Sequence, residues 1–260
     1  MQVPWLMRAV HGHQNVRLIA MLREPGARMY SAYFFWPQYR RRFGFEPSGF
    51  TKYATEMIDA FRACLVAQGG DSIGGTSATA GDGGAAAGGS HSPIGLSAAE
   101  RAALETCAIN FESLSAANEG TYYHADQLLK SLYAAFLPTW FAAFGRQSLL
   151  ILRAEDYWKA TSSTVQRVYE FLGVGAPTAD ATAAAARQPI GVLLGSNATF
   201  WGDKRVVNTH PARGTRVPAP MPTDARERLS DFFAPYNAEL ARLLGEPRFE
   251  WRDALMQITK

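Results

Sequence analysis

The stretch from Val16 to Tyr33 constrains the fold most, because a strand signal, a tight turn and a helix signal follow one another directly. A short apolar run, Leu18–Leu22, stops at the turn residues Arg23-Glu24-Pro25-Gly26. A helical pattern follows, and three large side chains share one of its faces: Met29, Tyr30 and Tyr33. This order predicts a buried strand, a turn and a helix, and Pro37 is expected to end that helix near Phe35.

Two polar residues fall where such a unit binds ligands. Arg23 would leave the carboxyl end of the strand, and Ser31 would lie about two turns into the helix. Ligands of an open α/β sheet bind outside those carboxyl ends, and a guanidinium fork beside a hydroxyl suits a phosphate. Taken alone, the stretch favours an ordinary βα unit in which Arg23 caps a carbonyl or pairs with Glu24.

A second strand, charged turn and helix occur further along the chain. Ser148–Leu152 is a short apolar strand, and a helix over Ser162–Leu172 ends at Gly173. Two such patterns predict an α/β fold with a parallel sheet. Glu155 and Asp156, which follow the second strand, could form an acid/base pair. We favour a structural role, in which they cap backbone amides of the following helix.

Helical patterns flank one low-complexity segment. Thr51–Val66 has Thr51 as its expected cap, and Ser97 with Glu100 forms a capping box that opens a helix through about Ile109. Gly69–Ser92 is nearly all Gly, Ala, Ser and Thr, so it has little to bury and is expected to be a flexible insertion. We predict a single domain over residues 1–260. The expected buried stripe of the Thr51–Val66 helix comprises Tyr53, Met57, Phe61 and Leu65.

Two further helical patterns follow the insertion. Thr121–Phe144 is rich in aromatic residues, and Pro138 is expected to break it into two pieces. A final helix starts at Thr223 and ends at Gly245, after which Phe249 and Trp251 are expected to pack back. Its expected buried stripe comprises Leu229, Phe232, Phe233, Leu240 and Leu243.

Arg40, Arg41 and Arg42 lie among aromatic residues, and we expect them on a surface loop after Pro37. Arginine forks suit sulfate as they suit phosphate, so these residues could bind an anionic substrate. A solvated basic turn explains them equally well.

Composition leaves the cellular compartment open. The net charge of +3 does not argue for nucleic acid as a partner, and no apolar run reaches the ~20 residues that span a bilayer. The first residues lack the apolar core of a signal peptide, so the protein is cytosolic or its targeting segment lies outside this sequence. Cys64 and Cys107 could be free thiols or a disulfide. Asn197 opens one glycosylation sequon.

Four motifs in this order resemble the sulfotransferase domain of the carbohydrate sulfotransferases, and the subgroup most similar is the N-acetylgalactosamine 4-sulfate 6-O-sulfotransferase type. The motifs are LIAMLREPGARMYSAY, Gly120-Thr121-Tyr122-Tyr123 with Gln127-Leu128, LLILRAEDYW with VQRVYEFLGV, and PMPTDARERLSDFFAPYNAELARLLG with Phe249 and Trp251. The resemblance implies a helix-rich, three-layer α/β domain with a parallel sheet, related to P-loop kinases. It also implies a cysteine pair between the first two motifs, where Cys64 and Cys107 stand.

The family's activity is transfer of a sulfuryl group from 3′-phosphoadenosine 5′-phosphosulfate to a glycan hydroxyl, without a metal. The resemblance therefore implies a polysaccharide or glycosaminoglycan as partner, no nucleic acid, and the Golgi lumen as location. Arg23 and Ser31 match the positions that hold the donor's 3′-phosphate. Arg213, Gly214, Thr215 and Arg216 match loosely the loop that closes over the donor, and Arg40–Arg42 are candidates for binding a sulfated acceptor.

One departure from the family concerns its N-terminal strand and phosphosulfate-binding loop, which has no counterpart before Val16. The domain is therefore expected to be incomplete at its N-terminus and inactive alone. The alternative is a truncated, non-catalytic module that binds nucleotide or anionic glycan. The catalytic base is not assigned, because His11 and His13 are more simply surface residues.

Overall fold

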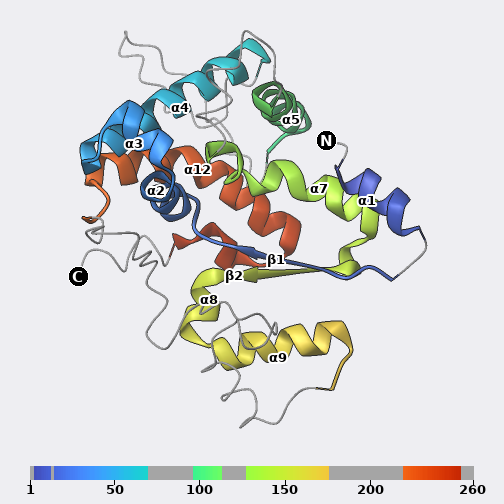
Figure 1. Ribbon diagram of the computed structural model, residues 1–260. Helices are drawn as coiled ribbons and strands as arrows, with labels where there is room; N and C mark the ends of the chain where they lie inside the picture. Colours follow the sequence, from blue (N-terminus) through green and yellow to red (C-terminus); the bar gives the residue numbers. More distant parts are fainter. Residues whose placement is uncertain (1–2, 13–14, 70–95, 113–126, 176–218, 253–260) are drawn as a thin grey trace, which may run out of the picture. The chain divides into compact units, whose positions relative to one another are not determined.

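The computed structural model describes residues 3–12, 15–69, 96–112, 127–175 and 219–252 (Figure 1). The chain divides into two compact units, which are described separately below. Unit 1 comprises Pro25–Thr139 and Ala219–Lys260 together with Met1, and unit 2 comprises Gln2–Glu24 and Trp140–Pro218. The single domain expected over residues 1–260 stays a prediction.

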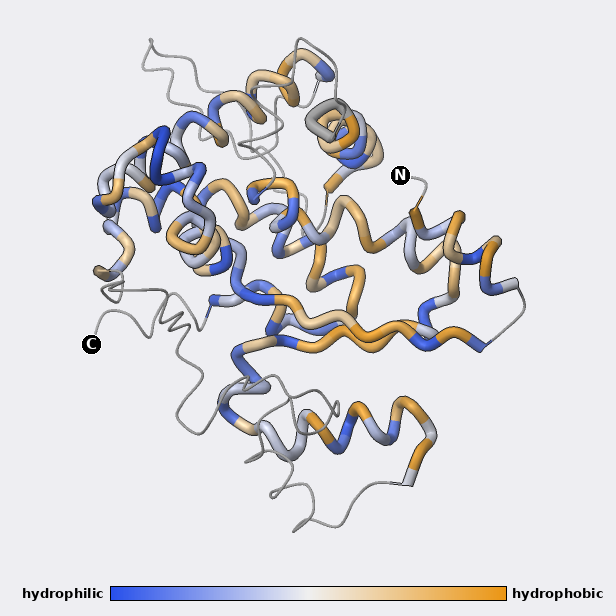
Figure 2. Tube along the Cα trace, in the orientation of Figure 1, coloured by the Kyte–Doolittle hydropathy of each residue, from blue (hydrophilic) through white to orange (hydrophobic). Residues whose placement is uncertain are grey.

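Unit 2 contains the two predicted strands as a parallel pair. Strand β1 (Leu18–Leu22) pairs with β2 (Leu149–Arg153), in a register that sets Leu18 opposite Leu149 and Leu22 opposite Arg153. Both strands run from hydrophobic residues into hydrophilic ones at their carboxyl ends (Figure 2). The described residues therefore form a helix-rich α/β fold with a small parallel sheet, as expected, while the three-layer arrangement stays a prediction.

Strand β1 is less buried than its apolar sequence predicts. Ile19 and Met21 are 43% and 48% exposed, whereas Leu22 is buried. In β2, by contrast, all residues but Leu150 are buried. The apolar run of β1 indicated a strand covered on both faces. Its alternate side chains point to opposite faces, so Ile19 and Met21 mark a face of β1 that remains half open.

Short helices precede and follow the two strands of unit 2 along the chain. They are α1 (Val3–His11), the 3-10 turn η1 (Arg146–Ser148), α8 (Ala154–Lys159) and α9 (Thr161–Leu172). Gly173 ends α9 in the left-handed conformation, at φ +68°, which confirms the predicted glycine stop. Helix α7 (Tyr133–Phe144) begins in unit 1 and ends in unit 2. Pro138 lies inside α7 and does not divide it, and the interruption falls earlier, at residues 130–132.

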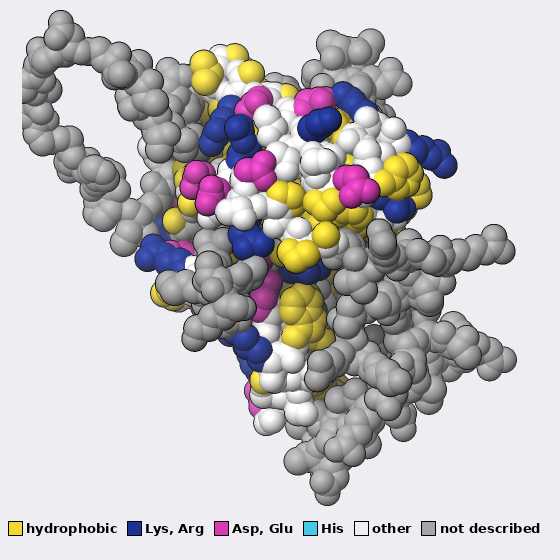
Figure 3. Space-filling view, turned by 90° about the vertical axis from the view of Figure 1, so that its left-hand side faces the viewer, with side chains coloured by type: hydrophobic (Ala, Val, Ile, Leu, Met, Phe, Trp, Pro, Cys, Tyr) yellow, Lys and Arg dark blue, Asp and Glu magenta, His cyan; other side chains and the backbone are white. Residues whose placement is uncertain are grey.

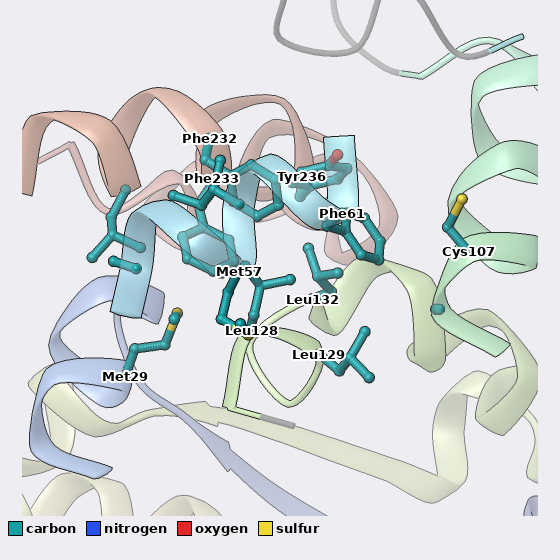
Figure 4. Packing of buried hydrophobic residues seen from close by; sticks show 14 of the residues in the cluster. Met29, Met57, Phe61, Cys107, Leu128, Leu129, Leu132, Phe232, Phe233 and Tyr236 are labelled. Atoms are coloured by element: carbon teal, nitrogen blue, oxygen red, sulfur yellow. The ribbon is translucent and has the colours of Figure 1, made fainter. Parts of the chain in front are cut away.

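Unit 1 is helical, and its helices enclose one hydrophobic core. They are α2 (Pro25–Phe35), α3 (Pro37–Phe43), α4 (Pro47–Ala67), α5 (Ala98–Glu112), the start of α7, α12 (Thr223–Leu244) and the 3-10 turn η2 (Pro247–Glu250). Figure 4 shows Phe232, Phe233 and Tyr236 of α12 with Met57 and Phe61 of α4 in this core.

Most of the predicted buried stripes are confirmed. The α4 residues Tyr53, Met57, Phe61 and Leu65 are all at most 2% exposed. In α12 the stripe ends at the buried Leu244, because Leu243 is only partly buried. Phe249 and Trp251 pack back as expected, and the Trp251 ring lies 6.2 Å from the Tyr133 ring of α7.

Two helix starts in unit 1 differ from the prediction for the same reason. Arg40, Arg41 and Arg42 lie in helix α3, not in a loop, because Pro37 stands at the first helical position. Helix α4 likewise starts at Pro47, four residues before the expected cap Thr51. Proline suits this first position, since its fixed φ is helical and its missing N–H would have no helical partner there.

A capping box begins helix α5, and a disulfide joins α5 to α4. The capping box is confirmed: the Ser97 amide donates to Glu100 Oε2 over 2.7 Å, and the Glu100 amide donates to Ser97 Oγ over 3.2 Å. Cys64 and Cys107 form the disulfide that the resemblance implied, with Cα atoms 5.9 Å apart. Helices α4 and α5 are therefore covalently linked.

A buried carboxylate connects α12 with the start of α5. Glu239 is 1% exposed, and its Oε2 accepts hydrogen bonds from the Leu96 amide (3.2 Å) and from Arg242 Nε (2.9 Å). Arg101 Nη1 lies 3.5 Å from Oε1. Burial acts to raise the pKa of Glu239, but the hydrogen bond and charge of Arg242, the Leu96 amide and the charge of Arg101 outweigh it and leave that pKa below its usual value.

Candidate functional site

The carboxyl ends of β1 and β2 bring together the polar residues that the sequence singled out after each strand. Arg23 follows β1 directly, Arg153 ends β2, and Glu155 and Asp156 begin α8. Parallel strands end at the same edge of a sheet, so these side chains share one edge of unit 2. This is the edge at which α/β sheets bind ligands.

Arg23 stacks on an exposed aromatic ring. Its guanidinium carbon lies 5.1 Å from the centroid of the Trp158 ring of α8, which is a cation–π distance, and Trp158 is 48% exposed. The contact holds the long Arg23 side chain against α8. Trp158 ends the third motif, LLILRAEDYW, but no sequence pattern paired it with Arg23, which follows the other strand.

Glu155 fixes the backbone beside Arg23. Its Oε1 accepts a hydrogen bond from the Glu24 amide over 2.9 Å, and its Oε2 lies 3.4 Å from Arg153 Nε. Arg153, only 4% exposed, also lies 3.6 Å from Asp156 Oδ1 through Nη1. Glu155 therefore has a structural role, as we favoured: it accepts a hydrogen bond from the amide before α2. The expected capping of amides in the following helix stays a prediction.

Ser31 lies in the middle of α2, which belongs to unit 1, whereas Arg23 belongs to unit 2. The structure thus describes each residue within its own unit, and their joint phosphate site stays a prediction. The helix that carries Ser31 packs through Met29 and Tyr33, both fully buried as expected. Burial raises the pKa of Tyr33 to about 12, so its hydroxyl stays protonated and donates to the Gly44 carbonyl over 2.5 Å.

A polar network that the sequence analysis missed orients α2 within unit 1. Arg28 Nε donates to Ser131 Oγ over 2.8 Å, and Arg28 Nη1 donates to Gln127 Oε1 over 3.1 Å. Gln127 Nε2 in turn donates to the Tyr39 hydroxyl of α3 over 3.0 Å. Gln127 and Ser131 are buried, so this network satisfies polar groups inside the core. Gln127 stood in the second motif, but no sequence pattern paired it with Arg28.

The three arginines of α3 have different surroundings. The Arg40 guanidinium carbon lies 5.5 Å from the Phe45 ring centroid, and Arg42 forms an exposed ion pair with Glu56. Arg41 is exposed and forms no ion pair with any residue that the structure describes. Figure 3 faces this side of unit 1 and shows arginines and lysines alternating with acidic and hydrophobic side chains.

Several predicted features lie outside the described residues. They are the donor loop Arg213, Gly214, Thr215 and Arg216, the sequon residue Asn197, nearly all of the Gly69–Ser92 insertion, and His13. His11 is described and is exposed at the end of α1. Within the described ranges, no group of three or more His, Cys, Asp or Glu side chains is placed to hold a metal ion. The helices seen there also lack the length and apolar character of a membrane span.

Comparison with known proteins places the chain beside one group of enzymes. It is 25% identical to human carbohydrate sulfotransferase 15 over 244 residues and 23% identical to the rat protein of the same name over 249 residues, which is 94% of this chain in each case. A protein of that name from Nototodarus sloanii is 28% identical over 111 residues, which is 43% of this chain and 59% of that protein.

The chain spans about a third of the length of the mammalian relatives, 32% in both. No protein-family model matches it, and no solved structure does. The similarity to the mammalian proteins nevertheless covers 94% of this chain. The predicted resemblance is therefore confirmed: the chain is similar to carbohydrate sulfotransferases over nearly its whole length.

Proposed function

We propose that the chain is the nucleotide- and glycan-binding part of a glycan O-sulfotransferase. In this function, a sulfuryl group moves from 3′-phosphoadenosine 5′-phosphosulfate to a hydroxyl of a polysaccharide. The observation that carries the proposal is Arg23, which stands at the carboxyl end of a parallel strand pair and stacks on Trp158. The similarity to carbohydrate sulfotransferases over 94% of the chain supports it.

The nucleotide end of the donor suits the residues at the sheet edge. Arg23 offers a planar fork of N–H donors, which matches a phosphate and remains charged at any physiological pH. Its backbone is fixed by the hydrogen bond from the Glu24 amide to Glu155, so the entropy lost on binding is reduced. We assign Arg23 and Ser31 to the 3′-phosphate, and the loop Arg213–Arg216 to closure over the donor.

In the transfer step, an oxygen of the acceptor forms a bond to sulfur as the bond from sulfur to the donor's 5′-phosphate oxygen breaks. Adenosine 3′,5′-bisphosphate leaves, and the acceptor proton passes to a base that no described residue is assigned to supply. Cationic side chains near the departing phosphate would lower the barrier by stabilising its charge. Arg40, Arg41 and Arg42 are proposed to bind an acceptor that is already sulfated.

The disulfide between α4 and α5 favours an oxidising compartment, since disulfides rarely persist in the cytosol. We propose the Golgi lumen, where a glycan acceptor would be met. The second candidate function is a non-catalytic module that binds nucleotide or anionic glycan. The same anion-binding arginines would serve this function, since binding alone needs no catalytic base.

Calorimetry with adenosine 3′,5′-bisphosphate tests the nucleotide site in the full chain. Arg23→Ala should weaken binding by about 10- to 100-fold, because hydrogen bonds to charged groups contribute about 1.5–3 kcal/mol. Arg17→Ala is the matched control, since Arg17 also stacks on an aromatic ring of unit 2, that of Phe171. Equal affinities of the Arg23→Ala variant and the unchanged protein would disprove the assignment.

A transfer assay then separates the two candidate functions. The chain is mixed with donor labelled on the sulfuryl group and with chondroitin, dermatan or galactan, and labelled polysaccharide is measured. Label in the polysaccharide, reduced in the Arg23→Ala variant, supports the enzyme. Nucleotide binding without any labelled polysaccharide supports the non-catalytic module.

A further inference from the structure

Exposed aromatic side chains stand in the chain just before and just after helix α3. Trp36, the residue before α3, is 45% exposed, and Phe45, just after it, is 66% exposed. Phe35 is also 45% exposed, and its ring meets the Trp36 ring edge-on at 4.7 Å between centroids. Aromatic residues are the side chains that a folding chain most gains by burying, so three exposed rings around one short helix call for an explanation.

The helical geometry of α3 sorts its residues into two faces. Tyr39 is fully buried and Phe43 packs against the same core, as expected for positions four residues apart. Arg40, Arg41 and Arg42 lie in the last turn of the helix and are at least partly exposed, so cationic side chains lie between Trp36 and Phe45 in the chain. Since α3 has seven residues, the helix is about 10 Å long.

Only part of this positive charge is neutralised nearby. Glu56 pairs with Arg42, and Glu46 follows Phe45 in the chain. Arg40 lies over the Phe45 ring at 5.5 Å, and Arg41 has no ion pair within the described part of the chain. A ligand that fits this surface must therefore combine negative charge with faces that stack on aromatic rings.

We propose that Trp36 and Phe45 stack on sugar rings of a sulfated glycosaminoglycan while Arg41 and Arg40 bind its sulfate groups. This extends the proposed function, on which it rests, by naming an acceptor-binding surface: Phe35, Trp36, α3 and Phe45. The C–H faces of a sugar ring stack on exposed aromatic rings, and sulfate accepts hydrogen bonds from guanidinium groups. The length of α3 is comparable with that of a disaccharide unit. A DNA duplex keeps its bases stacked inside the helix and so offers no ring faces to Trp36 and Phe45, which makes it the contrasting polyanion in the test.

Binding of the full chain to chondroitin 4-sulfate, unsulfated chondroitin and a DNA duplex tests this surface. Trp36→Ala and Phe45→Ala should each weaken binding to chondroitin 4-sulfate by about three- to tenfold, as for the loss of one aromatic contact. The loss should persist in high salt, because stacking is not screened. Arg41→Ala should weaken binding mainly in low salt and make the affinity fall less steeply with salt.

Two matched controls separate this surface from general effects. Trp5→Ala removes a tryptophan that is equally exposed, at 50%, on α1. Arg228→Ala removes an exposed arginine that pairs with Asp59 at 3.5 Å. Neither change should alter glycan affinity. Each variant is first shown to melt at the temperature of the unchanged protein, so that a lost affinity is not lost folding.

The outcomes separate this inference from the proposed function. Glycan binding that the Trp36 and Phe45 variants leave unchanged would overturn the surface, while normal nucleotide binding in the same samples would leave the proposed function standing. Equal or tighter binding of the DNA duplex, with no effect of the aromatic variants, would show a general polyanion site and also overturn it. Absence of binding to every glycan, in protein that melts cooperatively, would overturn both the surface and the glycan acceptor.

Discussion

The Trp158 ring lies under the guanidinium of Arg23, the residue proposed to bind the donor's 3′-phosphate. An exposed cation–π contact contributes about 0.5–1 kcal/mol, so Trp158→Leu should weaken binding of adenosine 3′,5′-bisphosphate by about two- to fivefold. Trp158→Phe keeps an aromatic face and should recover most of the affinity. Calorimetry measures both changes, and a Phe variant as weak as the Leu variant would count against stacking.

Glu239 makes a pH-dependent contribution to stability. Its pKa is lowered in the folded protein, mainly by Arg242 against the opposing effect of burial. The carboxylate therefore stabilises the fold fully above the unfolded pKa, near 4.5, and this stabilisation is lost as the pH falls through the lower folded value. Glu239→Gln should cost about 2–3 kcal/mol at pH 7, and the difference from the unchanged protein should shrink at acid pH.

Urea denaturation at pH 7 and at successively lower pH measures this difference. Glu105→Gln, an exposed residue on α5, serves as the control and should change stability little at either pH. A Glu239→Gln penalty that grows as the pH falls would contradict the assigned sign.

Helix α4 approaches its neighbours closely because its third residue is glycine. A Cβ at Gly49 would lie 2.5 Å from both the Tyr33 hydroxyl and the Phe43 carbonyl. Gly→Ala normally stabilises a helix by about 1 kcal/mol, but here Gly49→Ala should destabilise the protein by about 1–3 kcal/mol through overpacking. Thermal melts check this, with Ser48→Ala as the neighbouring control. A higher melting temperature for Gly49→Ala would show that α4 can shift freely.

The sequence predicted elements where one periodicity was decisive. The stripe of α4 followed from helical spacing, and a parallel sheet followed from the two strand–turn–helix patterns, although the direct pairing of β1 with β2 was not predicted. Proline was ambiguous, because the same residue can end a helix, start one or lie within one. Pro37 was interpreted only as a stop, although it also starts α3, and Pro138 was interpreted as a break, although α7 continues through it. Tertiary packing decides among these outcomes, and no local pattern records it.

At the candidate site, the sequence located residues but not their partners. Arg23 and Glu155 were both singled out from their positions after the strands. The hydrogen bond from the Glu24 amide to Glu155 joins residues 131 positions apart, so it depends on strand register. The contact of Trp158 with Arg23 was missed because the two residues are 135 positions apart in the sequence. Arg28 was missed for the same reason, since Gln127 and Ser131 lie about a hundred positions away.

At the scale of the whole molecule, one covalent link restrains the unfolded chain. Cys64 and Cys107 are 43 positions apart. In the chain-entropy account, a cross-link that closes a loop of that length in the unfolded chain raises the free energy of unfolding by about 4 kcal/mol. The double variant Cys64→Ala/Cys107→Ala should therefore unfold at a much lower urea concentration. Reductant should lower the midpoint of the unchanged protein similarly and leave the double variant unaffected. A midpoint insensitive to reductant and to substitution would contradict the stabilising role.

The disulfide also keeps the protein in one piece after a cut in its backbone between the two cysteines. The Gly69–Ser92 insertion lies between the two bridged cysteines, so cutting the backbone within it would not separate the two pieces. The product would be a two-chain protein that runs as one band without reductant and as two with it. A protein nicked there would still carry α4 and α5 as one molecule, and gels run with and without reductant would reveal the cut.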